Sequence, residues 1–184
     1  MTMGNTLSKP DTEVLIDATR LASRIRELGE QISSDYRGRT PHLVGVLMGA
    51  WVFMADLIRN LSIEVTVDFL GIQSYLAGTT SSGEVKITKD LDASIAGRDV
   101  LVVEDILDTG RTYQYLQGVL AAHQPDSVKL VALLDKAARR VVPVQADYVG
   151  FPIPDVFVVG YGLDYNQQFR RLPEVRILGN SVSE

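Results

Sequence analysis

The chain has 184 residues, of which 46% are hydrophobic and 22% charged, and this composition is typical of one folded globular domain. The 18 basic and 23 acidic side chains give a formal net charge of −5 without a long basic run, which argues against tight binding to duplex nucleic acid. Cysteine is absent, which excludes disulfide bonds, cysteine-ligated zinc and a thiol nucleophile. Neither a membrane-spanning apolar run nor a signal-peptide pattern occurs, so we expect a cytoplasmic protein that acts on small molecules, without nucleic-acid or membrane partners.

The first part of the sequence predicts an arm, a helix, a strand and a second helix. Residues 1–12 are polar and are expected to form a flexible arm before a single domain over residues 13–184. Asp17 is a candidate N-cap for a helix whose apolar residues recur every three or four positions, at Leu21, Ile25, Leu28 and Ile32. Residues 42–48 form a nearly continuous apolar run, which is typical of a strand buried on both faces, and residues 51–61 return to helical spacing.

An alternating segment and a polar loop come next. Residues 63–72 alternate between apolar and polar side chains, which predicts a half-buried strand. Its apolar face holds Ile63, Val65, Val67 and Phe69, and its polar face holds Glu64, Thr66 and Asp68. Residues 73–83 are small, polar and rich in glycine, which predicts a mobile lid loop, and residues 83–89 are expected to return as a strand.

The remaining elements complete an alternation of strands and helices. Residues 99–104 are the most strongly predicted buried strand, followed by a helix over about 112–123 and a further strand over 127–134. Shorter extended runs are expected around Tyr148, Phe157 and Val175. This order predicts an α/β fold with an open, mainly parallel twisted sheet flanked by helices, in which ligands bind beyond the carboxyl ends of the strands.

One segment combines a strand end, two carboxylates and the start of a helix. Residues 101–112 read LVVEDILDTGRT. Gly110 permits a positive φ, while hydroxyls at Thr109 and Thr112 flank the free N–H groups of a helix start, which is a combination suited to phosphate. Glu104 and Asp105 would repel a phosphate unless they held sugar hydroxyls or a metal ion. The segment therefore predicts a sugar phosphate bound with Mg²⁺, and the competing interpretation is an ordinary turn with a solvated carboxylate pair.

Other phosphate-binding motifs do not fit this sequence. A Walker loop needs GxxxxGK followed by Ser or Thr, and that pattern is absent. Gly160 and Gly162 begin a GxG pattern, but Tyr165 stands in place of the third glycine and no helical pattern follows, so a dinucleotide-binding loop is unsupported. An aspartyl-phosphate phosphatase needs an Asp-x-Asp pair, whereas Asp105 and Asp108 are three positions apart.

Residues 102–112, VVEDILDTGRT, resemble the phosphoribosyl diphosphate signature of the type I phosphoribosyltransferases, within the hypoxanthine-guanine branch. Three further segments resemble that branch in the same order along the chain: FMADL at 53–57, LLDK at 133–136 and VGFPIPDVFVVGYGLDYNQQFR at 149–170. The similarity extends over roughly residues 13–178. The resemblance implies the type I phosphoribosyltransferase fold, with a small hood formed by about residues 13–20 and 145–184.

The resemblance implies roles for the residues of the donor site. Glu104 and Asp105 are expected to hold the ribose 2- and 3-hydroxyls, directly or through Mg²⁺. Asp108 matches the general base near N7 of the purine, where it assists loss of the ring proton as N9 attacks. The 5-phosphate is expected to bind Thr109, Gly110, Arg111 and Thr112.

The resemblance also implies residues for the purine and the leaving group. Lys136 matches the lysine that contacts the purine 6-oxo group and so selects hypoxanthine or guanine over adenine. Phe157 is expected to stack on the base, and the backbone of Val158 to read its edge. Asp164 matches a ligand of a second Mg²⁺, and Arg170 is expected to pair with pyrophosphate.

Two loops complete the implied site. Ser74 and Tyr75 match the Ser-Tyr pair of the family's mobile loop, which closes over the site and excludes water. Met48 and Gly49 match the first active-site loop, where many relatives have Lys-Gly. The missing lysine removes a cation near the pyrophosphate or the subunit contact and puts the affinity for pyrophosphate in question, not the reaction class.

The resemblance implies a Mg²⁺-dependent enzyme of purine salvage. The expected reaction transfers the phosphoribosyl group from 5-phospho-α-D-ribose 1-diphosphate to N9 of hypoxanthine or guanine, giving IMP or GMP and pyrophosphate. The family is commonly dimeric or tetrameric, so a homodimer or homotetramer is expected. The alternative is a non-catalytic, nucleotide-binding regulator with the same fold, because fold alone does not establish activity.

Overall fold

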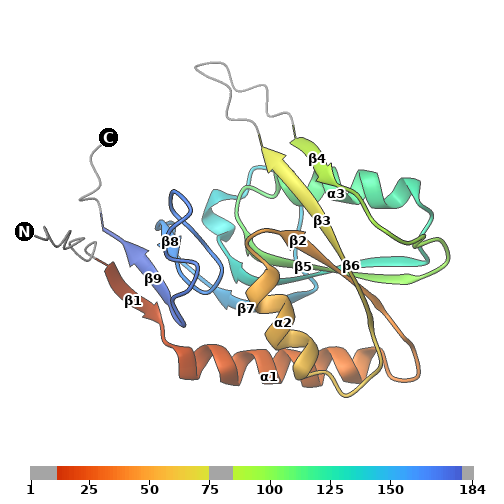
Figure 1. Ribbon diagram of the computed structural model, residues 1–184, viewed down its shortest axis with the longest axis horizontal. Helices are drawn as coiled ribbons and strands as arrows, with labels where there is room; N and C mark the ends of the chain where they lie inside the picture. Colours follow the sequence, from red (N-terminus) through yellow and green to blue (C-terminus); the bar gives the residue numbers. More distant parts are fainter. Residues whose placement is uncertain (1–11, 75–84, 180–184) are drawn as a thin grey trace, which may run out of the picture.

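The structure is a computed structural model that describes residues 12–74 and 85–179 (Figure 1). The predicted flexible arm lies almost entirely outside the described residues, and so does most of the predicted lid loop, including Tyr75. Both remain predictions. No helix within these two ranges is long and apolar enough to cross a membrane.

A six-stranded sheet forms the centre of the molecule, with the strand order β4-β3-β2-β5-β6-β7 (Figure 1). All neighbouring strands are parallel except β4, which runs antiparallel to β3 at one edge. This arrangement confirms the predicted α/β fold with a mainly parallel sheet. The strands are β2 (His42–Leu47), β3 (Thr66–Ser74), β4 (Val85–Lys89), β5 (Asp99–Leu107), β6 (Ser127–Asp135) and β7 (Tyr148–Pro152).

Helices cover both faces of this sheet (Figure 1). Helices α1 (Ala18–Asp35) and α2 (Trp51–Arg59) pack on one face, where Leu101 and Val103 of β5 join their apolar side chains in one core. Helix α3 (Arg111–Ala122) packs on the other face, against Val100 and Val102 of the same strand. Because alternate residues of β5 enter opposite cores, residues 100–103 are apolar without interruption, and each buried Val or Leu contributes about 1.5–3 kcal/mol.

The helix boundaries follow from local chemistry. The Asp17 carboxylate accepts a hydrogen bond of 2.9 Å from the Arg20 N–H, so Asp17 caps α1 as predicted. Helix α1 ends at Asp35, shortly before Gly38, which has a φ of +76°. A short 3₁₀ helix, η1 (Ala137–Arg139), follows β6.

A second sheet of three antiparallel strands lies beside the first (Figure 1). Its order is β1 (Thr12–Ile16), β9 (Val175–Leu178) and β8 (Val158–Val159), so it joins the two ends of the described chain. This small sheet lies within the range expected for the hood. The expected hood was broader, because β7 falls inside it by sequence but pairs with β6 in the central sheet.

The alternating pattern at residues 63–72 was misleading in two respects. Strand β3 begins only at Thr66, and within it Val67 is exposed whereas Asp68 is buried. Both oxygens of Asp68 have partners: Oδ1 accepts the Phe69 N–H and pairs with the Lys89 ammonium, and Oδ2 accepts the Asp92 N–H. Burial acts to raise the pKa of Asp68, but these contacts outweigh it and lower the pKa below its ordinary value. The ion pair between Asp68 and Lys89 of the edge strand β4 therefore accounts for the buried position of Asp68, where the alternation predicts a polar, exposed face.

Candidate active site

Two adjoining cavities open at the carboxyl ends of β2, β5 and β6, with volumes of about 280 and 270 Å³. They share Gly49, Asp105, Ile106 and Asp108 along their boundary. The predicted site residues in the first cavity are Gly49, Glu104, Asp105, Asp108, Thr109, Gly110 and Thr112. Those in the second are Met48, Gly49, Asp105, Asp108, Lys136, Phe157, Val158, Asp164 and Arg170.

The carboxylate pair lies within β5 and not beyond its end. The strand continues to Leu107, which pairs with Asp135 of β6, so Glu104 and Asp105 sit on a fixed backbone. Glu104 is only 6% exposed, which contradicts the interpretation of this pair as solvated surface charge. Burial, together with the charge of Asp105, raises the pKa of Glu104 well above its ordinary value. Burial also raises the pKa of Asp105 to about 6, although the Ile106 N–H and the Arg170 charge act in the opposite direction.

The loop after β2 presses directly against this pair. A Cβ atom at Gly49 would lie 1.6 Å from Oδ2 of Asp105, so no residue with a side chain fits there without displacing the carboxylate. The preceding peptide bond, between Leu47 and Met48, is cis. The Met48 side chain is 58% exposed and lines the second cavity. Met48 and Gly49, which resemble the family's first active-site loop, therefore lie in a segment whose backbone packs on Asp105.

The loop between β5 and α3 has the geometry of an anion site. Gly110 has a φ of +85° and immediately precedes α3, and its N-cap position makes no side-chain hydrogen bond with the helix. This helix start lines the first cavity through Gly110 and Thr112, together with Thr109, whose hydroxyl accepts a hydrogen bond of 3.4 Å from the Arg111 N–H. Arg111 begins α3 but lies outside both cavities and is exposed.

Arg140 holds this loop against the end of β6, and sequence reasoning missed it. Its guanidinium donates hydrogen bonds to the carbonyl oxygens of Asp108 (2.9 Å), Leu107 (3.1 Å) and Val144 (2.6 Å). It also forms an ion pair with Asp135. One side chain thus fixes two consecutive carbonyl groups of the loop that carries Asp108.

The second cavity has an unusual combination of a buried cation and an exposed aromatic ring. Lys136 is 4% exposed, and no ion pair to its ammonium occurs among the described residues. Phe157 is 52% exposed and makes an edge-to-face contact of 5.7 Å with the ring of Tyr165. In most proteins a phenylalanine is buried and a lysine is exposed, which is the reverse of what Phe157 and Lys136 show. The cavity therefore offers a free ring face and a hydrogen-bond donor to a flat, polar ligand.

Asp108 stands between the two cavities. Its Oδ1 atom is buried and has no hydrogen-bond partner among the described residues. The nearest cation is Arg139 of η1, whose Nε atom lies 3.5 Å from Oδ1 of Asp108 and 3.6 Å from Oδ1 of Asp155. Asp108 lines both cavities, and a carboxylate there is suited to accept a proton or hydrogen bond from a ligand. Arg139 is a second residue that sequence reasoning missed, because its spacing carries no signal.

Asp164 and Arg170 form an ion pair across a compact turn. An Arg170 guanidinium nitrogen lies 2.7 Å from Asp164 Oδ1, and the Gln167 N–H donates to Asp164 Oδ2 at 2.9 Å. Another Arg170 nitrogen donates to the Gly162 carbonyl at 2.8 Å, while the Arg170 Nε atom is buried without a partner in the described part of the chain. Arg170 therefore places a cation, paired with the Asp164 carboxylate, among the residues that line the second cavity.

Comparison with known proteins decides the family. Residues 12–166 match the family described as the phosphoribosyl transferase domain. The chain belongs to the phosphoribosyltransferase family. It is 46% identical to the hypoxanthine-guanine phosphoribosyltransferase of Bacillus subtilis (strain 168) over 179 residues, which cover 97% of this chain and 99% of that protein.

Solved structures and a longer relative place the chain in the hypoxanthine-guanine branch of these phosphoribosyltransferases. A crystal structure of a hypoxanthine phosphoribosyltransferase from Staphylococcus aureus matches with a TM-score of 0.89 and 44% identity, covering 94% of each chain. The bifunctional protein TilS/HprT of Listeria monocytogenes serotype 4b (strain F2365) is 54% identical over 166 residues, 90% of this chain. The chain spans only about a quarter (26%) of that longer relative. The resemblance predicted from the sequence motifs is confirmed.

The structure of this phosphoribosyltransferase brings most of the predicted site residues together. Arg111 is the exception among those whose side chains are described, because it lines neither cavity. Ser74 is the last residue of β3, and Tyr75 lies outside the described residues, so the predicted lid stays a prediction. Besides Arg139 and Arg140, sequence reasoning missed Tyr161, which ties the Asp164 turn to α2.

Proposed function

We propose that this phosphoribosyltransferase transfers the phosphoribosyl group of 5-phospho-α-D-ribose 1-diphosphate to N9 of hypoxanthine or guanine. The products are IMP or GMP and pyrophosphate, which makes it an enzyme of purine salvage. The observation that carries the proposal is the shared boundary of the two cavities at Asp105 and Asp108. A cavity suited to a sugar phosphate there meets a cavity suited to a flat base, so the two reacting atoms can be held next to each other.

The first cavity would bind the ribose 5-phosphate. The 5-phosphate accepts hydrogen bonds from the N–H groups at the start of α3 and from the hydroxyls of Thr109 and Thr112. The backbone of Arg111 belongs to this helix start, whereas its side chain does not reach the cavity. The ribose 2- and 3-hydroxyls donate to the oxygens of Glu104, which is buried, and of Asp105, which is half-buried.

The acidic pair also fits Mg²⁺. Carboxylate oxygens are the ligands that this ion prefers, and a buried pair with raised pKa values gains from a nearby cation. The described residues contain no group of three or more acidic, His or Cys side chains arranged for a metal, so substrate oxygens and water would complete the coordination. When bound, the ion supplies positive charge against the diphosphate. Asp164 is proposed for a second ion, although both its oxygens already accept protein hydrogen bonds or charge.

The second cavity would bind the purine. The base stacks on the exposed Phe157 ring, the backbone of Val158 reads its edge, and the buried Lys136 ammonium donates to the 6-oxo group. Adenine presents an amino group at that position, which would leave the ammonium without an acceptor and cost affinity. Asp108 accepts the proton that the purine loses as N9 attacks the anomeric carbon.

The leaving pyrophosphate lies on the side of the site where the protein supplies positive charge. Arg170 would bind the leaving pyrophosphate through charge-assisted hydrogen bonds, next to the backbone of Gly49. Met48 offers no cation there, so the affinity for pyrophosphate is expected to depend more strongly on Arg170 than in relatives with lysine. Closure of a lid carrying Ser74 and Tyr75 would exclude water, which otherwise hydrolyses the donor.

Two wider properties belong to the same proposal. We place the protein in the cytoplasm, and we propose that it works as a homodimer or homotetramer. Met48, at the second cavity, and Trp51, in the first turn of α2, are large exposed apolar side chains, and a second copy would cover such a surface. Light scattering with mass determination tests this, and a monomer at assay concentration would contradict it.

The test of the reaction is release of pyrophosphate from phosphoribosyl diphosphate, measured in parallel with hypoxanthine, guanine, xanthine and adenine. Release with hypoxanthine and guanine, only when Mg²⁺ is present, is the expected result. Release with adenine at an equal rate would contradict the role of Lys136. No release with any base, from protein shown by calorimetry to bind the donor, would instead support a non-catalytic nucleotide-binding regulator.

A further inference from the structure

Three successive residues in the turn before Asp164 adopt the left-handed backbone region. Gly160, Tyr161 and Gly162 have φ angles of +94°, +52° and +98°. Glycine adopts this region freely, but a bulky aromatic residue there is uncommon and persists only when its surroundings hold it. Tyr161 is therefore the residue of this turn whose conformation needs an external restraint.

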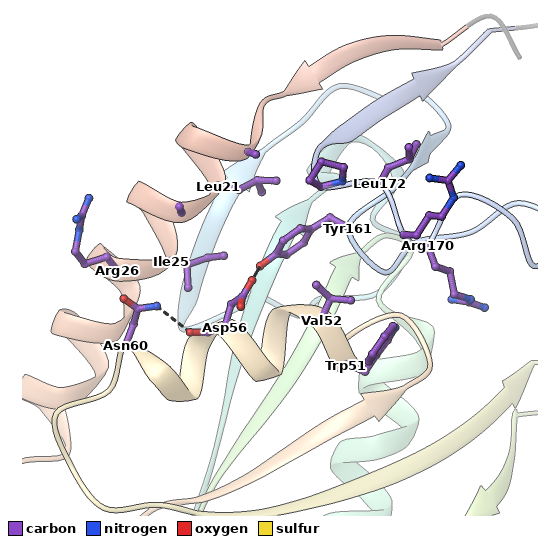
Figure 2. A pocket seen from close by; sticks show the side chains of 14 residues that line it. Leu21, Ile25, Arg26, Trp51, Val52, Asp56, Asn60, Tyr161, Arg170 and Leu172 are labelled. Carbon is purple, nitrogen blue, oxygen red and sulfur yellow. Dashed lines mark hydrogen bonds between the residues drawn. The ribbon is translucent and has the colours of Figure 1, made fainter. Parts of the chain in front are cut away.

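The restraint comes from α2. Tyr161 and Asp56 line neither of the two site cavities, but both line a third cavity of about 690 Å³, which Arg170 also lines. The Tyr161 ring is buried, and its hydroxyl donates a hydrogen bond of 2.5 Å to Oδ2 of Asp56 (Figure 2). The Tyr161 N–H donates to the Leu172 carbonyl at 2.8 Å. Arg59 is the cation beside Asp56, with 3.1 Å between Nη1 and Oδ1. Burial and the hydrogen bond to Asp56 raise the pKa of Tyr161, so its hydroxyl remains a donor at neutral pH.

Gly162, the next residue, contacts two parts of the proposed pyrophosphate site. A Cβ atom at Gly162 would lie 2.5 Å from the Gly49 carbonyl oxygen, so the turn rests directly on the first active-site loop. The Gly162 N–H donates to the Arg170 carbonyl at 3.0 Å, and the Arg170 guanidinium donates to the Gly162 carbonyl at 2.8 Å. Any movement of the turn therefore displaces both Gly49 and Arg170.

We propose that the Tyr161–Asp56 hydrogen bond is a positioning clamp that sets the affinity for the diphosphate end of the donor. The clamp lies outside the reacting groups and acts through Gly162, which transmits its position to Gly49 and Arg170. The inference rests on the proposed function, because it assigns the diphosphate to that side of the site. Tyr161 and Asp56 are positioning residues, and the base side of the cavity does not depend on them.

Tyr161→Phe tests the clamp because it removes the hydroxyl and keeps the ring. Tyr148→Phe is a matched control: the Tyr148 hydroxyl donates to Asp35 at 2.8 Å between β7 and α1, away from both cavities. We expect the KM for phosphoribosyl diphosphate to rise about five- to tenfold in Tyr161→Phe, with the KM for hypoxanthine changed less than about twofold. Tyr148→Phe should lower Tm similarly and leave both KM values within about twofold of the wild type.

Asp56→Asn gives an independent test, because the Asn side-chain oxygen still accepts the Tyr161 hydroxyl. We expect Asp56→Asn to retain a donor KM closer to wild type than Asp56→Ala does. In the double variant Tyr161→Phe with Asp56→Ala, the donor KM should be no worse than in the worse of the two single variants, since both changes remove one interaction. Additive losses, or equal rises in the KM for donor and base, would show a general loss of stability and overturn the clamp.

Failure of the clamp and failure of the proposed function give different results. If the wild type releases pyrophosphate and Tyr161→Phe keeps a wild-type donor KM, the clamp is wrong and the function stands. If the wild type binds the donor in calorimetry without turnover, the ratio of donor Kd values still tests the clamp. A wild type that neither binds nor turns over the donor overturns both.

Discussion

The donor half of the site lies on one strand and one helix start, whereas the base and leaving-group half comes from irregular segments between residues 136 and 170. Glu104 and Asp105 belong to β5, which pairs with β2 and β6 on either side. Asp164 and Arg170 lie in a turn with bridges between Gly160 and Leu163 and between Tyr165 and Gln168. The first half is fixed by the central sheet, and the second by backbone hydrogen bonds within the turn together with side-chain contacts such as that of Arg170 with the Gly162 carbonyl. Substitutions at the ribose-phosphate residues should therefore affect the donor and those at the base residues the purine, whereas Arg170 and the clamp behind it act on the diphosphate end of the donor.

Asp108→Asn should have the largest effect, because Asp108 stands at the boundary of the halves. The amide cannot accept the purine proton, so kcat is expected to fall roughly 10²- to 10⁴-fold, with the donor KM changed little. Steady-state kinetics with hypoxanthine measures both parameters. Asp155→Asn is the control, since Asp155 also pairs with Arg139 and lies outside both cavities. Equal kcat in Asp108→Asn and the wild type would remove Asp108 as the required base.

Gly49→Ala should come next, with its main effect on the donor, because Gly49 packs on Asp105 and adjoins the proposed pyrophosphate site. The added Cβ would collide with Oδ2 of Asp105 at 1.6 Å, so the loop or the carboxylate must move. A displacement of about 1 Å at the reacting groups costs on the order of 100-fold in kcat/KM. Gly118→Ala in α3 is the control, because nothing lies within 4 Å of a Cβ there. Unchanged kcat/KM for the donor in Gly49→Ala would contradict the tight packing of this loop.

Asp105→Asn should stabilise the protein at neutral pH in the absence of substrate. The folded-state pKa of Asp105 is raised from 3.8 to about 6, so its ionisation destabilises the fold progressively between those values and fully above them. The gain from removing the charge is on the order of 2–3 kcal/mol above pH 6 and vanishes below about pH 4. Urea unfolding at several pH values measures it.

Asp68→Asn should show the opposite sign in the same experiment. The folded-state pKa of Asp68 is lowered, so its ionised form stabilises the fold above its unfolded-state pKa, and this contribution is lost as the pH falls through the folded-state pKa. Destabilisation of Asp105→Asn at pH 7, parallel to that of Asp68→Asn, would show that the acidic pair is satisfied within the protein. The argument for a cation or sugar hydroxyls at that pair would then fail.

The donor half could be predicted from sequence because its signals are local. The apolar run before Glu104, the glycine at position 110 and the flanking hydroxyls act over a few residues, and the strand and helix that they predict are the ones observed. The burial of Glu104 was not predictable, because a carboxylate at a strand end is usually solvated. The loop after β2 packs on the neighbouring Asp105, a contact between segments far apart in the sequence.

The second half was accessible only through its resemblance to a known family. By pattern alone Lys136 would be assigned to the surface and Phe157 to the core, and both assignments are the reverse of what the structure shows. The contacts of Arg139 and Arg140 depend on the path of the chain after β6, and no residue spacing encodes them. Val67 and Asp68 also differ from the prediction. The alternation of apolar and polar residues predicts a buried Val67, but the ion pair of Asp68 with Lys89 holds Asp68 in the buried position and Val67 is exposed.

Lys136→Met should give the smallest effect, and only on the base half. Methionine matches the buried apolar stem of Lys136 but lacks its charge, so the kcat/KM for hypoxanthine is expected to fall about tenfold. The donor KM should not change, and discrimination against adenine should weaken because no unpaired ammonium remains. Lys129→Met on the same strand is the control, since the Lys129 ammonium lies 5.6 Å from the centroids of the Tyr36 and Tyr148 rings and outside both cavities. A rise in donor KM in Lys136→Met without a change toward hypoxanthine would mean that Lys136 serves the donor, and the division of the site into two halves would have to be redrawn.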